Sequence, residues 1–145
     1  MMARLEFDGL DSLMTDLDSL AHLPDRVVED MLNAEADVLV PAQRAEISSR
    51  WRGKYSEGIS AKSVKKSKMK TTKDGRAVHI YPQGTRKRGK KRVRNAEIAF
   101  INEYGAPKRG IAPRPAIAAA NAKAEQTAVD AGEQVFNAYL DSKNL

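Results

Sequence analysis

The feature that most constrains the fold is the segment from residue 98 to residue 117, which joins two helical patterns through a short connector. An apolar run at residues 98–101 leads into Glu103-Tyr104-Gly105, and Arg114 then stands between two prolines at the entry of a long helical pattern. Glycine ends a helix readily because it tolerates a positive φ, and proline fixes its own φ at a helix entry. The order of these parts predicts a tight turn between two elements.

Five residues of this segment form a candidate structural motif: Glu103, Tyr104, Gly105, Arg114 and Pro115. Gly105 should stop the first element, and we expect Tyr104 to fill a core. We expect Glu103 and Arg114 to form an ion pair that pins the turn to the last helix. A partly buried, bidentate pair could fix an interface, whereas an exposed pair adds little. A structural or subunit-interface role is favoured over a ligand pocket.

Charge is strongly segregated along the chain behind a net charge of +6. Residues 1–50 hold 4 Lys/Arg and 11 Asp/Glu, residues 51–94 hold 16 and 2, and residues 95–145 hold 5 and 6, which gives net charges of −7, +14 and −1. Such segregation favours partners with opposite patches, including another copy of the chain in a head-to-tail ring. The alternative is a solvated basic loop.

The length of 145 residues predicts one domain over residues 1–145 with a single core. The chain has no cysteine, no run of about 18 apolar residues, and no basic-then-apolar start typical of a secretory signal. We therefore expect a soluble protein made in a cytoplasm, without disulfides, thiolate metal sites or membrane partners.

The first 22 residues predict a short strand and an acidic helix. Residues 4–7 have the pattern of a strand, and Asp8 can cap the helix that follows. The apolar side chains of this helix recur at helical spacing, at Leu10, Leu13, Met14, Leu17 and Leu20.

A second helix is predicted from near Pro24 to residue 47, with Pro41 inside it. Proline removes one backbone hydrogen bond and crowds the carbonyl four residues earlier. We therefore expect a kink near Asp37 and a helix in two pieces. The alternative is that the helix ends near Leu39 and a loop follows it.

A basic hairpin is predicted in the middle of the chain. Residues 59–70 have the pattern of a basic strand and residues 77–81 that of its partner, with Gly75 in the turn. Alternation places Val78 and Ile80 toward the core.

The segment 84–94 that follows is predicted to be a flexible basic arm. Its only apolar side chain to bury is Val93, so burial cannot offset the entropy lost on ordering until a partner binds. Its cations are the candidate interface or DNA-channel residues: Arg86, Lys87, Arg88, Lys90, Lys91, Arg92 and Arg94.

Two further helices complete the predicted fold. Asn95 can cap a helix that runs to Tyr104, although a strand at residues 97–103 is an alternative. We expect residues 116–140 to form a long helix, and its stripe of small side chains favours close packing on the sheet. The fold class is α+β: a small antiparallel sheet with a basic hairpin, packed against a long kinked N-terminal helix and a long C-terminal helix.

The sequence argues against an enzyme. His22 and His79 are too few and too far apart to suggest a metal pair, and no phosphate-binding glycine loop, nucleophile elbow or metalloprotease motif occurs. We expect no catalytic residues, metal or cofactor. A small toxin-like or nuclease-like protein is disfavoured because the basic segments lack nearby acid or base groups.

Sequence-independent DNA binding is the main alternative to protein assembly. Each phosphate that Lys or Arg neutralises releases counterions, and the arm could contact several phosphates. Trp51, Tyr55 and Tyr81 are not interleaved with the basic residues, as a platform for stacking single-stranded bases requires.

Several short motifs resemble the gp-ten-like minor tail, or neck, family of long-tailed bacteriophages. They are an N-terminal Phe7-Asp8-Gly9-Leu10, a middle Gly53-Lys54-Tyr55-Ser56-Glu57-Gly58-Ile59, and the pair Glu103-Tyr104-Gly105 and Arg114-Pro115. The resemblance extends over about residues 7–135. The chain departs from the family at Arg52-Gly53-Lys54-Tyr55, where Thr-Gly-x-Leu is common, and at Ala116, where Phe is usual.

The resemblance implies a structural virion protein. Members of such a family form a ring around the DNA channel at the head–tail junction, here with about six copies expected. The implied partners are other copies of the chain and other neck, head-closure or tail-terminator proteins, with nonspecific contact to double-stranded DNA in the channel. The implied location is the virion, assembled in the bacterial cytoplasm.

Overall fold

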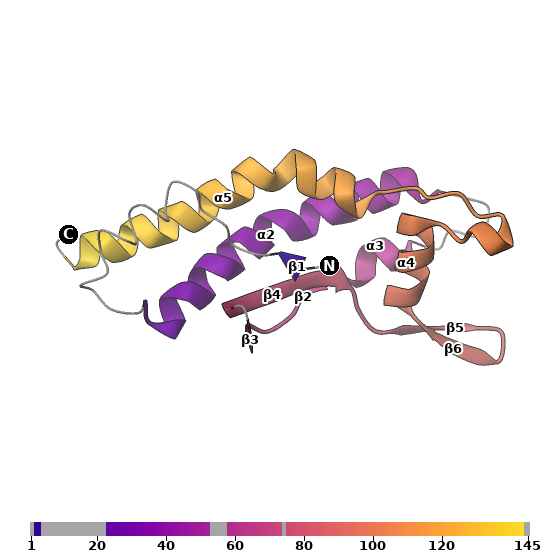
Figure 1. Ribbon diagram of the computed structural model, residues 1–145, viewed down its shortest axis with the longest axis horizontal. Coiled ribbons are helices and arrows are strands. Elements are labelled where there is room, and N and C mark those ends of the chain that lie inside the picture. The colour runs from indigo at the N-terminus through magenta and orange to yellow at the C-terminus, as the bar shows by residue number, and fades with distance from the viewer. Residues whose placement is uncertain (1, 4–22, 53–57, 74, 144–145) are drawn as a thin grey trace.

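The computed structural model describes residues 2–3, 23–52, 58–73 and 75–143. The predicted strand at residues 4–7, the acidic helix at residues 8–20, and the side chains of His22 and Tyr55 lie outside these residues. The fold is α+β, as predicted: two long helices lie side by side, and a small antiparallel sheet covers one of them (Figure 1).

The first long helix, α2 (Asp25–Arg50), begins directly after Pro24 and buries one stripe of side chains. The carbonyl of Pro24 accepts hydrogen bonds from the N–H groups of Val27 and Val28, which starts the helix. The buried side chains recur every three or four residues, as a helix with one covered face requires. They are Met31, Leu32, Glu35, Ala36, Leu39, Gln43 and Ile47.

Helix α2 continues through Pro41, so the prediction of a helix in two pieces was wrong. Pro41 and Asp37 are both exposed, and they lie one helical turn apart on the solvent side. The Asp37 carbonyl that Pro41 leaves without an N–H partner therefore faces water. On the opposite side Leu39, Gln43 and Ile47 are buried, and their packing keeps the helix continuous across Pro41.

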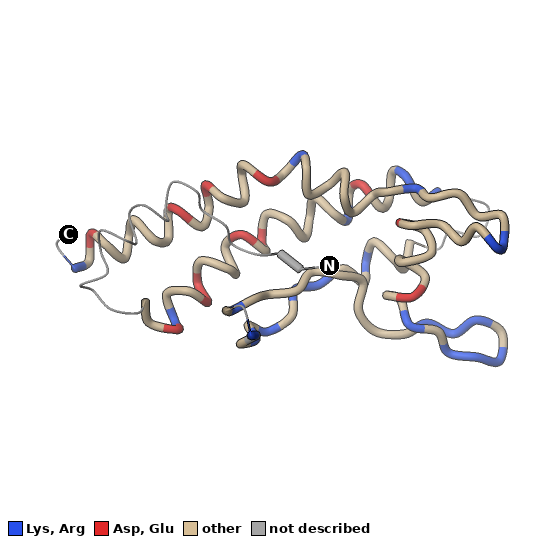
Figure 2. The backbone as a smooth tube through the Cα atoms, viewed as in Figure 1, with Lys and Arg blue, Asp and Glu red and all other residues tan. Residues whose placement is uncertain are grey.

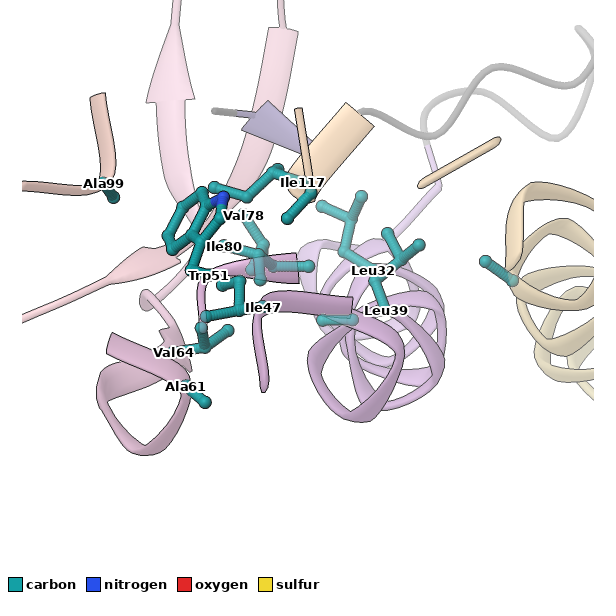
Figure 3. Packing of buried hydrophobic residues seen from close by; sticks show 13 residues of the cluster. Leu32, Leu39, Ile47, Trp51, Ala61, Val64, Val78, Ile80, Ala99 and Ile117 are labelled. Atoms are coloured by element: carbon teal, nitrogen blue, oxygen red, sulfur yellow. The ribbon is translucent and has the colours of Figure 1, made fainter. Parts of the chain in front are cut away.

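The second long helix, α5 (Ile117–Ser142), runs antiparallel to α2 and contacts it over most of its length (Figure 1). Small buried residues on α5, Ala120, Ala128 and Gly132, allow the two backbones to approach closely. The predicted stripe of small side chains is present, but the prediction that it packs on the sheet was wrong, because it packs on α2. Ile117, at the start of α5, lies in one cluster with Val78 and Ile80 of the sheet (Figure 3).

The sheet is built around strand β4 (Gly75–Pro82), which pairs antiparallel with three shorter strands: β1 (Met2–Ala3), β2 (Val64–Lys66) and β3 (Lys70–Thr72). Val64 lies opposite Pro82, and Thr72 lies opposite Gly75. Strands β2 and β3 thus form the predicted partner of β4, interrupted at residues 67–69. Val78 and Ile80 face the core, as predicted.

The basic strand expected over residues 59–70 begins later than predicted. Residues 59–63 form a short helix, α3 (Ile59–Ser63), which follows Gly58 at φ 72°. Ala61 and Ser63 are buried there beside Val64. Residues 59–62 alternate between apolar and polar side chains, as a strand would, but Gly58 with its positive φ turns the chain and a helix follows.

Residues 85–94 form a β-hairpin where we had predicted a flexible arm without regular structure. Strand β5 (Thr85–Arg88) pairs antiparallel with β6 (Lys91–Arg94), and Gly89 takes a φ of 62° in the turn. Strand β6 leads directly into α4 (Asn95–Tyr104), which ends at Gly105. A 3-10 turn, η2 (Pro107–Arg109), lies between α4 and α5.

The prediction of a helix that stops at Gly105 is confirmed, and the alternative strand at residues 97–103 is excluded. Asn95 does not cap this helix. It is the first helical residue, and its side chain bonds to the hairpin instead.

Candidate assembly surface

The basic hairpin, β5 and β6, is fixed at its root by the buried side chain of Asn95. The Asn95 amide donates to the carbonyl of Gln83 at 2.7 Å and its oxygen accepts from Nε of Arg86 at 2.7 Å. Arg86 also donates to the hydroxyl of Ser60 at 2.6 Å. These bonds join strand β5 and the segment before it to α3 and α4. The Arg86 side chain is therefore used within the fold.

The tip of the hairpin is different. Lys87, Arg88, Lys90 and Lys91 are exposed, and within the described residues none of them forms an ion pair or a side-chain hydrogen bond. We call these four residues the basic tip. A four-residue strand spans about 13 Å, so the tip projects well beyond the root (Figures 1 and 2).

The two remaining predicted cations of the arm bond within the hairpin region. Nε of Arg92 donates to the hydroxyl of Thr85 at 3.1 Å, and Arg94 pairs with Glu97 at 2.9 Å on the surface. Of the seven predicted residues, the four of the basic tip are the ones that form no ion pair or side-chain hydrogen bond within the described residues.

On α4, the helix that follows the hairpin, Phe100 and Tyr104 form an exposed aromatic pair. They lie one turn apart on α4, with ring centroids 4.8 Å apart and planes tilted by 51°. Each side chain is 63% exposed. The prediction that Tyr104 fills a core was wrong, because α4 buries Asn95, Ala99 and Glu103 and turns the aromatic pair outward.

A shallow, mostly apolar pocket of about 220 Å³ lies beside the aromatic pair. It is formed where the end of β4, one face of α4 and the first residue of α5 meet. Besides Phe100 and Tyr104, its lining residues are Tyr81, Pro82, Ala96, Ala99, Glu103 and Ile117.

Glu103, which is 5% exposed, holds α4 to the start of α5. Its carboxylate accepts hydrogen bonds from three backbone N–H groups, those of Ala116 and Ile117 at 2.8 Å and that of Ala118 at 2.9 Å. The first N–H groups of a helix have no partner within it and carry the positive end of its dipole. A carboxylate there is satisfied without a cation, and Glu103 therefore caps α5 from another helix.

The predicted pair of Glu103 with Arg114 does not form. Arg114 donates instead to the side-chain oxygen of Asn102 at 2.8 Å and to the carbonyl of Arg52 at 3.3 Å. The indole N–H of Trp51 donates to the carbonyl of Arg114 at 2.7 Å. Arg114 thus joins the end of α2 to the end of α4, and Pro115 follows it, exposed, at the entry of α5.

Gly105 is required in this joint for two reasons. Its φ of 75° and ψ of 179° lie in a region that is essentially restricted to glycine. A Cβ at this position would also stand 2.7 Å from the carbonyl oxygen of Ile111 and 2.8 Å from the nitrogen of Pro113. The segment from Glu103 to Pro115 is therefore a structural joint that presents the pocket and the hairpin.

The opposite end of the molecule is acidic. We call residues 23–30 at the start of α2 and residues 133–143 at the end of α5 the acidic end; they hold five carboxylates and two cations. Figure 2 shows acidic residues along both long helices and basic residues along the sheet and hairpin. Leu23, Val27, Val135 and Leu140 are partly buried there around Met31 and Phe136.

Between the two long helices, Glu35 is buried with one carboxylate oxygen, Oε2, lacking a hydrogen bond among the described residues. Burial, and to a lesser extent the carboxylate of Glu125, raises the pKa of Glu35 to about 7. At the surface of the same pair of helices, hydrogen bonds from Lys123 and Arg50 lower the pKa of Glu46.

Sequence reasoning missed Phe100 and Glu35 as residues of interest. Phe100 lies four residues before Tyr104, a spacing that places both on one side of a helix, and this signal was present in the sequence. The burial of Glu35 was also signalled, because it falls within the apolar stripe of α2. The role of Asn95 could not be read from the chain, since its partners depend on the hairpin.

In the described ranges 23–52, 58–73 and 75–143, no three His, Asp or Glu side chains lie close enough together to hold a metal ion. Among the helices of these residues, none has both the length and the apolar content needed to span a bilayer. Comparison of the chain with protein-family models, curated proteins and solved structures found no match.

Proposed function

We propose that this chain is a structural virion protein that forms an oligomeric ring at the head–tail junction of a long-tailed bacteriophage. The ring would connect the head connector to the tail around the DNA channel. The observation that carries the proposal is the placement of an unpaired basic tip at one end of the molecule and an acidic surface at the other (Figure 2).

These two charged ends cannot neutralise each other within one molecule. Helix α2 has 26 residues, so its ends lie about 39 Å apart. The Debye length at physiological salt is about 8 Å, which screens attraction over that distance. Only a second molecule can bring an acidic end against a basic tip. A contact between two different surfaces of identical chains repeats head to tail, and it closes into a ring when the rotation per step permits.

The motif residues support the same function. Glu103, Gly105 and Arg114 are used within the joint, where they hold three helix ends together. The joint gives the hairpin a fixed direction relative to the two long helices, as a ring subunit needs. The resemblance of the short motifs to neck proteins gives the location at the head–tail junction and the expectation of about six copies.

Charge reversal at the basic tip tests this function in the phage that encodes the chain. The variant carries Lys87→Glu, Arg88→Glu, Lys90→Glu and Lys91→Glu, and it leaves Arg86 unchanged because Arg86 is part of the hairpin root. We expect a folded protein and a loss of infectious particles. A matched control reverses four cations elsewhere: Lys62, Lys68, Lys70 and Lys73, which are also exposed. Normal particle yield from the tip variant would contradict the proposal.

Sequence-independent DNA binding is a second candidate, favoured by the same projecting tip. A two-stranded ribbon fits the major groove of B-DNA, and four cations could contact four phosphates. Affinity for random duplex should then fall roughly 150-fold between 50 and 200 mM salt. Little or no binding at either salt concentration is expected if the tip contacts protein, so a salt titration of the purified chain separates the two functions.

A further inference from the structure

We infer that the aromatic pair and the pocket beside it are the apolar centre of the contact between two copies of this chain, and that the acidic end of the neighbouring copy covers them. The inference rests on the proposed ring and names its two contacting surfaces. It adds an apolar centre to the contact between charged surfaces. Such a centre is needed for affinity, because charge complementarity alone mainly sets the orientation and the rate of association.

The aromatic pair has the properties of an interface centre. In the described residues, Phe100 and Tyr104 are the two large apolar side chains that stand exposed. They are held on a helix whose other face is fixed by the buried residues Ala99 and Glu103, so both rings are presented on a rigid support. Aromatic side chains are enriched among the residues that dominate binding, and they bury a large area at low cost in conformational entropy.

The pocket beside the pair gives this surface a shape that an aliphatic side chain can fill. Its volume of about 220 Å³ lies between the end of β4 and the face of α4, and Pro82, Ala99 and Ile117 contribute apolar walls. The carboxylate of Glu103 reaches the pocket wall but already accepts three backbone hydrogen bonds. The pocket therefore selects an apolar occupant.

The acidic end offers the complementary chemistry. Leu23, Val27, Val135 and Leu140 provide aliphatic side chains that the chain buries only in part. Around them stand exposed carboxylates, among them Glu29, Asp30 and Asp141. The aromatic pair, in turn, lies on α4, the helix that directly follows the hairpin whose tip carries four unpaired cations. An aliphatic patch beside carboxylates thus matches an aromatic patch on the part of the molecule that carries the basic tip.

The aromatic pair and the basic tip lie on either side of the hairpin root. The basic tip extends about 13 Å from the root, and the pair lies on α4, which begins at the root and is about 15 Å long. The start of α2 and the end of α5 lie side by side (Figure 1), and packed helices are separated by about 8–10 Å. A contact that covers the aromatic pair and reaches the basic tip therefore spans more than about 13 Å, so it uses side chains from both helix ends of the neighbour.

Photo-cross-linking of the full chain tests the assignment. The photoreactive residue p-benzoylphenylalanine replaces Tyr104, whose exposure makes the replacement compatible with folding. This protein is mixed with isotope-labelled wild-type chain at up to about 1 mM, where a contact of millimolar affinity is populated. Mass spectrometry then locates cross-links between labelled and unlabelled chains. The control places the same residue at Thr127, an exposed position in the middle of α5.

We expect cross-links from position 104 to residues 23–30 or 133–143 of the other chain, and none from position 127. In parallel, Phe100→Ala and Tyr104→Ala should each weaken self-association roughly 30-fold or more, as residues at an interface centre do, while Thr127→Ala leaves it unchanged. Cross-links to residues 8–20, to the hairpin or within one chain would overturn the inference, as would an absence of self-association or alanine variants that associate normally.

The failure of this inference differs from the failure of the proposed ring. Chains that assemble with cross-links elsewhere overturn the named surfaces and leave the ring intact. Normal particle yield from the basic-tip variant overturns the ring, whatever the cross-links show.

Discussion

The carboxylate of Glu103, near the end of α4, accepts a 2.8 Å hydrogen bond from the backbone N–H of Ile117, the first residue of α5. The two residues are 14 positions apart, and the connector between them carries three prolines and Gly105. Capping across this connector fixes the angle between a short helix and a long one, and with it the position of the pocket and the hairpin.

Loss of this cap should destabilise the protein strongly. Glu103→Ala leaves three buried or part-buried N–H groups without their acceptor, and we expect the free energy of unfolding to fall by about 2–3 kcal/mol in urea denaturation. The control is Glu97→Ala, which removes an exposed ion pair with Arg94 on the same helix. Its effect should stay below about 0.5 kcal/mol. Equal losses for the two variants would show that Glu103 is not a cap.

Gly105→Ala should cost about 3 kcal/mol or more, because the new Cβ meets the backbone of Ile111 and Pro113 and the backbone conformation is unfavourable for alanine. Gly89→Ala in the hairpin turn is the matched control. It also has a positive φ, of 62°, but a Cβ there meets nothing within 4 Å. It should cost about 1 kcal/mol, the penalty of the left-handed conformation alone. A comparable loss at both positions would argue against close packing at Gly105.

Glu35 should make stability depend on pH in a defined window. Its pKa is about 7 in the folded chain against a model value of 4.5, so the folded state holds the proton more tightly. The resulting stabilisation is complete below pH 4.5 and is lost as the pH rises toward 7. After solvent screening we expect a decrease of about 1–2 kcal/mol over that range, and Glu35→Gln should abolish it.

Two observations check this assignment. Glu125→Gln should reduce the dependence of stability on pH only slightly, because burial is the larger cause of the raised pKa of Glu35 and the carboxylate of Glu125 is the smaller one. The pKa of Glu46 is lowered, so its contribution to stability is lost only as the pH falls below the ordinary value of 4.5. Glu46 therefore does not affect the change in stability between pH 4.5 and 7. An unchanged slope in Glu35→Gln would contradict the burial of this carboxyl group.

Asn95→Ala should loosen the basic hairpin without unfolding the long helices. The substitution removes the bonds from Asn95 to Gln83 and Arg86 at the hairpin root. We expect faster amide hydrogen exchange at residues 85–94, and unchanged exchange in the middle of α2 and α5. Arg92→Ala, which removes one exposed bond to Thr85, is the control and should have little effect. Unchanged exchange in Asn95→Ala would mean that the root does not hold the hairpin.

The helices and the core face of the sheet were predictable from the sequence, because the spacing of apolar residues indicates which face of a helix or strand is buried. The stripe of α2, the alternation at Val78 and Ile80, and the stop at Gly105 follow from local rules. These rules fail where tertiary contacts decide. Pro41 does not divide α2, because the packed face opposite it holds the helix together.

The candidate site was predictable only in part. The run of cations was visible, but the division between Arg86 at the root and the four residues of the basic tip depends on where Asn95 and Ser60 lie. The partner of Glu103 was misassigned, because a backbone N–H group at a distant helix start has no signature in residue type. Tyr104 was placed in the core on its aromatic character, whereas the buried neighbours Ala99 and Glu103 turn it outward.

Mixing two charge-reversed variants of the full chain tests the head-to-tail contact most directly. One variant carries glutamate at the four positions of the basic tip, and the other carries Glu29→Lys, Asp30→Lys and Asp141→Lys at the acidic end. Each retains one intact surface. Sedimentation velocity at up to about 1 mM should show each variant alone as a monomer of 16.0 kDa. The mixture should form assemblies of roughly 32 kDa and larger, because the native tip meets the native acidic end and the reversed tip meets the reversed acidic end. A mixture that stays monomeric, or a single variant that assembles as the wild type does, would contradict the contact between these two ends.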